Sequence, residues 1–67
     1  MENWLQAALR EADTTLERIM DISPEDARHL TEHPGRLTLG KINAIARALP
    51  HDTAIRMLDT MRETFAL

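Results

Sequence analysis

Apolar side chains recur at helical spacing along most of this sequence, and this pattern restricts the possible folds more than any other feature. Apolar positions three and four residues apart lie on one face of an α-helix, whereas a half-buried strand needs strict alternation. Such alternation is absent, and the chain contains no valine, a residue favoured in strands. The sequence therefore predicts an all-α fold, a compact bundle of about five short helices.

Capping residues and prolines mark where these helices are expected to begin and end. Ser23-Pro24 is the strongest start signal, because it combines a capping hydroxyl with proline at the first helical position. Asn3 is an expected N-cap, and Thr14 with Glu17 matches a capping box. The expected helices are 4–12, 15–21, Pro24 to the break at Pro34-Gly35, the segment after Thr38 up to Pro50, and the segment after Asp52 to the end. The fourth carries a long inward stripe: Leu39, Ile42, Ile45, Ala46 and Leu49.

A chain of 67 residues is expected to form one domain, 1–67. It has no cysteine, so disulfides and cysteine-based zinc sites are excluded and helix packing must stabilise the fold. No apolar run is long enough to span a membrane, and the start is too polar for a secretory signal. These features predict a cytoplasmic protein without a membrane partner.

The net charge of −3 disfavours nucleic-acid binding by the chain as a whole, but the charges are unevenly distributed. Acidic residues crowd the first half. Between 28 and 47 the chain carries a single acid, Glu32, and four basic residues: Arg28, Arg36, Lys41 and Arg47. A local basic face of this kind can bind DNA.

Residues 16–30 have the proportions of a helix-turn-helix. A short helix is followed by a turn in which Ile22 is placed to fill the corner between the two helices, and Ser23 caps the second. Ala27 and Leu30 are expected to face the core. The outer face of the second helix is then free to enter a major groove.

This stretch resembles the Cro and lambda-repressor-like helix-turn-helix family, also called the XRE family. The resemblance rests on Met20, Ile22-Ser23 and Ala27, and on the glycine loop and fourth-helix stripe of residues 35–49. It spans roughly residues 5–58. It implies a sequence-specific DNA-binding regulator, a repressor of phage or mobile-element type that controls its own gene as a dimer on a palindromic operator.

Two sets of residues are the predicted sites. On the third helix, Arg28 and His29 are expected to reach base edges, with Glu32 and His33 one turn later, and Glu25 can accept a hydrogen bond from a cytosine amino group. Arg36, Thr38 and Lys41 are expected to bind phosphate. The apolar residues of the last helix either form a two-fold dimer contact or complete the monomer core: Met57, Met61, Phe65 and Leu67.

Two rival interpretations remain. Residues 29–33 match the inverted zinc-protease pattern H-x-x-E-H, with His29 and His33 as ligands and Glu32 as base. The helix breaks at once after this pattern and the chain is too short to build a substrate cleft, so we expect no enzyme, metal site, cofactor or small-molecule ligand. The stronger rival is an acidic protein-interaction module, such as an antirepressor, antitoxin or anti-CRISPR-like inhibitor. The sign of the charge over the third helix distinguishes this module from a DNA-binding protein.

Overall fold

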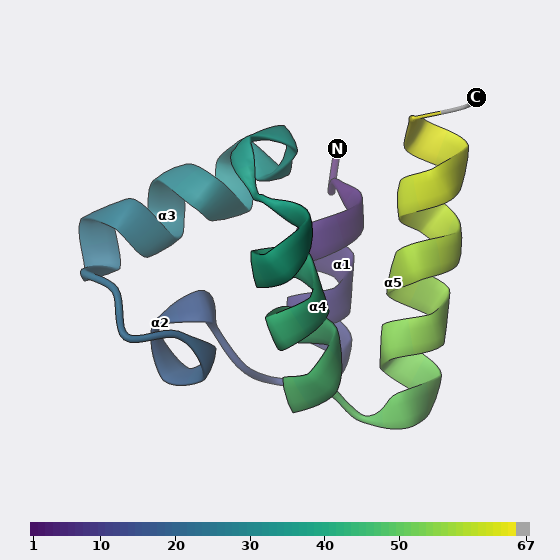
Figure 1. Ribbon diagram of the computed structural model, residues 1–67, viewed down its shortest axis with the longest axis horizontal. Helices are drawn as coiled ribbons and strands as arrows, with labels where there is room; N and C mark the ends of the chain where they lie inside the picture. The colour runs from purple at the N-terminus through teal and green to yellow at the C-terminus, as the bar shows by residue number, and fades with distance from the viewer. Residues whose placement is uncertain (66–67) are drawn as a thin grey trace.

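The computed structural model describes residues 1–65, and within this range the chain forms five α-helices, one 3-10 helix and no strand (Figure 1). The all-α prediction is confirmed. The elements are α1 (Trp4–Glu11), α2 (Leu16–Ile19), α3 (Pro24–Glu32), η1 (Pro34–Arg36), α4 (Leu39–Ala48) and α5 (His51–Thr64). None of the helices in the described range is long and apolar enough to cross a membrane.

The helices pack around a common core, with α5 on one side and the pair α2 and α3 on the other (Figure 1). α5 runs antiparallel to α1, packs against it and also contacts α4, while α2 and α3 lie together on the side away from α5 (Figure 1). α1 and α4 lie between these two sides, and they contact α3 and α2 respectively. The buried apolar residues come from all five α-helices and from Leu37 and Leu49 between them: Trp4, Leu5, Ala8, Leu9, Leu16, Ala27, Leu37, Ile42, Ile45, Leu49, Ala54 and Met57.

Asn3 joins the start of α1 to the end of α3. Its side-chain oxygen accepts hydrogen bonds from the backbone N–H groups of Leu5 and Gln6, at 3.0 and 2.8 Å. Its side-chain amide donates to the carbonyl oxygen of Thr31 at 2.8 Å. Asn3 is therefore the predicted N-cap of α1 and also satisfies a carbonyl in the last turn of α3.

The end of α1 corrects the predicted start of the second helix. Asp13 has a left-handed backbone, φ 52°, and the Thr14 N–H donates to the Leu9 carbonyl while the Asp13 N–H donates to the Arg10 carbonyl. These bonds form a Schellman motif, which terminates a helix. The Thr14 N–H is thus already used, and a capping box would need it for Glu17. The helix instead begins after Thr15, whose side chain makes no capping hydrogen bond, and has four residues.

The caps of the later helices agree better with the sequence. Ser23 and Thr38 cap α3 and α4, and α3 ends just before Pro34. The prediction that Leu39 belongs to the inward stripe of the fourth helix was wrong, because Leu39 is 81% exposed. Ile42, Ile45 and Leu49 set the inward direction of α4, and Leu39 is rotated about a quarter turn from it. The last helix begins at His51, before Asp52.

Candidate nucleic-acid interface

α2, the turn at residues 20–23 and α3 follow one another as a short helix, a turn and a second helix that is exposed on one side. Ile22 in the turn is half-buried and packs against the core, as predicted. On α3, Ala27 is buried and Leu30 is half-buried. The Ser23 hydroxyl accepts a hydrogen bond from the Asp26 N–H at 3.1 Å and so fixes the start of the helix. The opposite side of α3 remains in solvent.

The predicted base-reading residues occupy different sides of α3. Successive residues turn by about 100° around a helix, so Glu25, His29 and Glu32 lie roughly opposite the buried Ala27. All three are exposed and form the outermost stripe of α3. Arg28 is also exposed but lies on the flank that faces α1.

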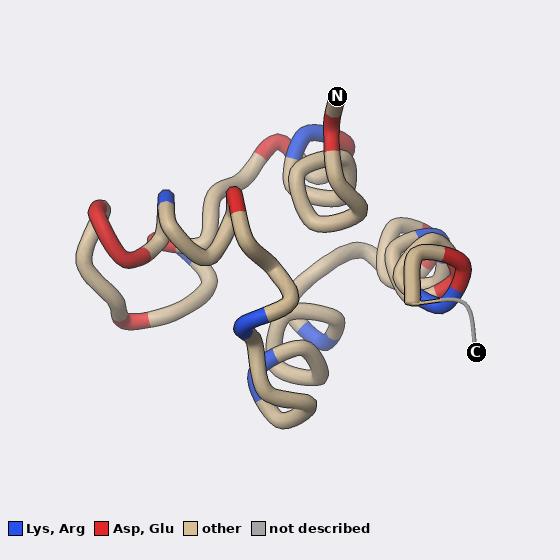
Figure 2. Tube along the Cα trace, turned by 90° about the horizontal axis from the view of Figure 1, so that it is seen from above, with Lys and Arg blue, Asp and Glu red and all other residues tan. Residues whose placement is uncertain are grey.

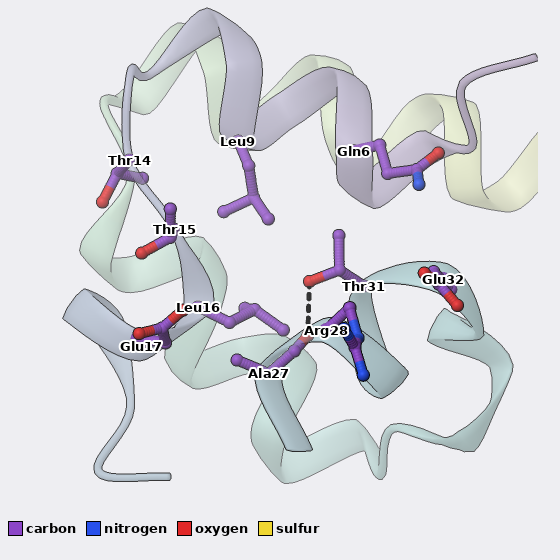
Figure 3. A pocket seen from close by; sticks show the side chains of 10 residues that line it. All are labelled: Gln6, Leu9, Thr14, Thr15, Leu16, Glu17, Ala27, Arg28, Thr31 and Glu32. Atoms are coloured by element: carbon purple, nitrogen blue, oxygen red, sulfur yellow. Dashed lines mark hydrogen bonds between the residues drawn. The ribbon is translucent and has the colours of Figure 1, made fainter. Parts of the chain in front are cut away.

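A groove of about 340 Å³ separates that flank from α1 and the start of α2 (Figure 3). Leu9, Leu16 and Ala27 provide its apolar lining, and Arg28 and Glu32 line its α3 side. The Thr31 hydroxyl donates to the Ala27 carbonyl at 2.6 Å, the bond drawn in Figure 3. Arg28 therefore shares its flank with a carboxylate, which weakens the positive field there.

The predicted phosphate-binding residues follow α3 directly. Arg36 is the last residue of η1, and Lys41 lies in the first turn of α4; both side chains are exposed. The Thr38 hydroxyl accepts a hydrogen bond from the Lys41 N–H at 3.2 Å, so its oxygen caps α4 while its proton can still be donated. α4 adds the exposed Arg47, which lay in the basic stretch of the sequence but was not among the predicted site residues.

Charge is strongly separated between these elements. Residues 17–32 contain five acids and two arginines, whereas residues 33–50 contain three basic residues and no acid. Figure 2 shows the acidic positions around the α2–α3 turn and the basic positions along η1 and α4. The basic surface predicted from Arg28 to Lys41 is thus acidic on α3 and basic only beyond it.

The predicted dimer residues of α5 are mostly used inside the monomer. Met57 is 2% exposed and belongs to the core, so for this residue the dimer-surface alternative was wrong and the core alternative holds. Met61 is half-buried against the core. Phe65 is 48% exposed and meets Trp4 edge to face, with ring centroids 6.5 Å apart. Leu67 lies outside the described residues.

Neither salt bridge of the described range includes a residue of α3. Glu2 pairs with Arg10 at 2.8 Å, and Arg56 pairs with Glu11. The hydrogen bond from the Arg10 guanidinium lowers the pKa of the Glu2 carboxyl and raises the pKa of Arg10, and the hydrogen bond to Glu11 raises the pKa of Arg56. Both pairs are exposed, so they contribute little to the stability of the fold.

Two further findings concern the identity of the site. Among residues 1–65, no group of three or more His, Cys, Asp or Glu side chains is arranged to hold a metal ion, so His29, Glu32 and His33 do not form a three-ligand centre. Comparison of the chain with protein-family models, curated proteins and solved structures found no match.

Proposed function

We propose that this protein binds double-stranded DNA through its helix-turn-helix, with α3 in the major groove and Arg36, Thr38 and Lys41 on the phosphate backbone. The observation that carries the proposal is the exposed α3, held on its inner side by Ala27 and Leu30 and capped by Ser23. A helix supported in this way fits the major groove. The acid-free segment 33–50 supplies the positive charge that phosphate contacts need.

The proposed biological role is that of a small autoregulating repressor of phage or mobile-element type. Such repressors act by occlusion: a dimer would place two copies of α3 in successive major grooves of a palindromic operator. The grooves are roughly 34 Å apart on one face of the duplex. The longest dimension of one chain, 31 Å, is of the same order as this spacing.

The proposal is tested by binding measurements on DNA selected from a random pool and on DNA from upstream of the protein's own gene. Lys41→Ala should weaken binding to every sequence and lower the slope of log affinity against log salt by about 1. Arg62→Ala on α5 is the matched control, because it removes an exposed cation from the side away from α3. Equal effects of the two variants, or no binding at micromolar protein, would contradict the proposal.

Arg28→Ala tests the reading of bases separately. It should relax the preferred sequence obtained by selection while changing affinity for random DNA little. An equal loss on selected and random DNA would instead make Arg28 a phosphate contact, in keeping with its place on the flank of α3.

A second function, that of an acidic protein-interaction module, is the one that the sign of the charge on α3 favours. Glu25, Asp26 and Glu32 are exposed, and Glu25 and Glu32 flank His29 on the outermost stripe. Such a face is complementary to a basic protein surface. If DNA does not bind, affinity capture with the wild-type protein should recover a partner that the variant Glu25→Gln/Glu32→Gln loses.

A further inference from the structure

His29 and His33 form a pair of imidazoles on the exposed side of α3. The His33 N–H donates to the His29 carbonyl at 2.9 Å, so the helical register continues to His33 although its backbone leaves the helix there. Their ring centroids are 6.4 Å apart and the ring planes are inclined by 34°. The protein thus presents two nitrogen ligands, one helical turn apart, to solvent.

Both rings are free to close on a common ion. Within residues 1–65, neither imidazole makes a hydrogen bond or a salt bridge to another side chain, and both residues are exposed. Two imidazoles on one metal, each with its nitrogen about 2.1 Å from the ion, bring their centroids to about 5 Å. The required approach is short, and rotation about the side-chain bonds of exposed residues can provide it.

We propose that His29 and His33 chelate a divalent transition metal ion of the class that imidazole prefers: Cu²⁺, Ni²⁺ or Zn²⁺. Imidazole nitrogen selects these ions over Mg²⁺ and Ca²⁺, which prefer oxygen ligands, and Cu²⁺ should bind most tightly of the three. The described residues offer no three-ligand group, so water fills the other coordination positions. The site is therefore open and binds reversibly.

The position of the pair gives the metal a consequence for DNA binding, and this step rests on the proposed function. His29 lies on the outermost stripe of α3, the surface that would face base edges. A hydrated ion held there would occupy the space between α3 and the base edges of the major groove. The metal and DNA should therefore compete, and a metal-loaded protein should bind DNA more weakly.

The first experiment uses the protein alone and the metal alone. Zn²⁺ and Ni²⁺ are titrated into wild-type protein and into His29→Ala, His33→Ala and His51→Ala, with heat and imidazole NMR signals as readouts. The chain's third histidine, His51, is an exposed residue on α5 and serves as the matched control. Two ligands held on one helix face act as a chelate, so loss of either His29 or His33 should weaken affinity about 100-fold.

The outcomes of this titration are distinct. His51→Ala should leave the affinity unchanged, and excess Mg²⁺ should not displace Zn²⁺. Equal Zn²⁺ affinity in wild type and His29→Ala would overturn the site. Displacement of Zn²⁺ by Mg²⁺ would also overturn it, because the ion would then be bound by carboxylates. Circular dichroism checks that each variant keeps its helices, and the two single variants give independent tests.

The second experiment separates the metal site from the proposed function. DNA binding is measured with and without saturating Zn²⁺, in wild type and in His29→Ala. Zn²⁺ should weaken DNA binding by wild type and leave the variant unaffected. If the DNA affinity of the wild-type protein is the same with and without bound Zn²⁺, the proposed competition is wrong. If the protein binds the metal but never binds DNA, only the DNA-binding function is wrong.

Discussion

At the scale of single residues, two leucines show how far an apolar pattern determines burial. Leu16 is 1% exposed and Leu39 is 81% exposed, although both sit at positions that the spacing assigns to the core. Leu16→Ala should lower the free energy of unfolding by about 2–5 kcal/mol, through lost transfer energy and a cavity. A domain of this length has roughly 3–10 kcal/mol in total, so urea unfolding should shift strongly.

Leu39→Ala is the matched control for this prediction, because it makes the same chemical change at a solvent-exposed site. It should alter the free energy of unfolding by less than about 0.5 kcal/mol. A loss like that of Leu16→Ala would mean that Leu39 is buried in solution, as the sequence pattern alone predicted.

A second prediction at this scale concerns Asn3, and it is tested by the sign of the change in stability that a substitution there produces. Asp in place of Asn3 keeps the acceptor that caps α1 and adds a negative charge at a helix N-terminus, which alone would stabilise the protein. It also removes the N–H that donates to Thr31 and sets a carboxylate against that carbonyl. We expect Asn3→Asp to destabilise the protein by about 1 kcal/mol.

Hydrogen exchange locates this effect. The amides in the last turn of α3 should exchange faster in Asn3→Asp, while those of α1 should not. A stabilised protein with unchanged exchange in α3 would show that Asn3 acts only as the cap of α1.

At the scale of helices and turns, the caps of α2 and α3 give a paired prediction. The Ser23 hydroxyl caps α3, whereas the Thr15 side chain makes no capping hydrogen bond. Ser23→Ala should therefore cost about 1 kcal/mol, and Thr15→Ala only a few tenths. Thermal unfolding followed by circular dichroism measures both, and equal losses would show that Thr15 caps α2 in solution.

The turn after α1 gives a prediction of the opposite sign. Asp13 has φ 52°, a conformation that costs an L-residue energy and costs glycine none. Asp13→Gly should stabilise the protein by about 0.5 kcal/mol. Ala12→Gly, one residue earlier in right-handed backbone, should destabilise it by about as much, and a melting temperature lowered by both variants would contradict the Schellman assignment.

Short sequence patterns predicted where helices begin and end, but they did not predict the contacts between residues far apart in the chain. Ser23-Pro24, Thr38 and Asn3 act through hydrogen bonds within three residues, so the sequence contains the whole signal. The Asn3–Thr31 bond joins residues 28 positions apart, and no local pattern indicates it. The predicted capping box at Thr14 was wrong for a related reason. The end of α1 already uses the Thr14 N–H, and the capping-box pattern describes only the helix that follows.

The sequence predicted that the candidate residues are exposed, but not how they are arranged around α3. The sequence placed Arg28 and His29 together on an outer face, whereas Arg28 lines the groove beside α1. For Met57 the sequence left a dimer surface and the monomer core open, because helical spacing identifies an apolar face without saying what covers it. α1 and α4 pack on that face, and this follows only from the tertiary structure.

At the scale of the whole molecule, the separation of charge decides which partner the α3 surface can accept. The variant Glu25→Gln/Asp26→Asn removes two carboxylates from the start of α3. A carboxylate roughly 8 Å from a phosphate costs about 0.5 kcal/mol in water, so this double variant should bind DNA about fivefold more tightly at low salt. The gain should shrink as salt screens the repulsion.

Asp59→Asn/Glu63→Gln on α5 is the control for this last prediction, because it changes the net charge by the same amount at exposed positions of another helix. If α3 faces DNA, the α5 variant should gain much less than the α3 variant at every salt concentration. Equal gains would mean that only net charge matters and that α3 has no special place in the complex. No gain from either, together with loss of a captured protein partner from the α3 variant alone, would assign the acidic end of α3 to protein recognition.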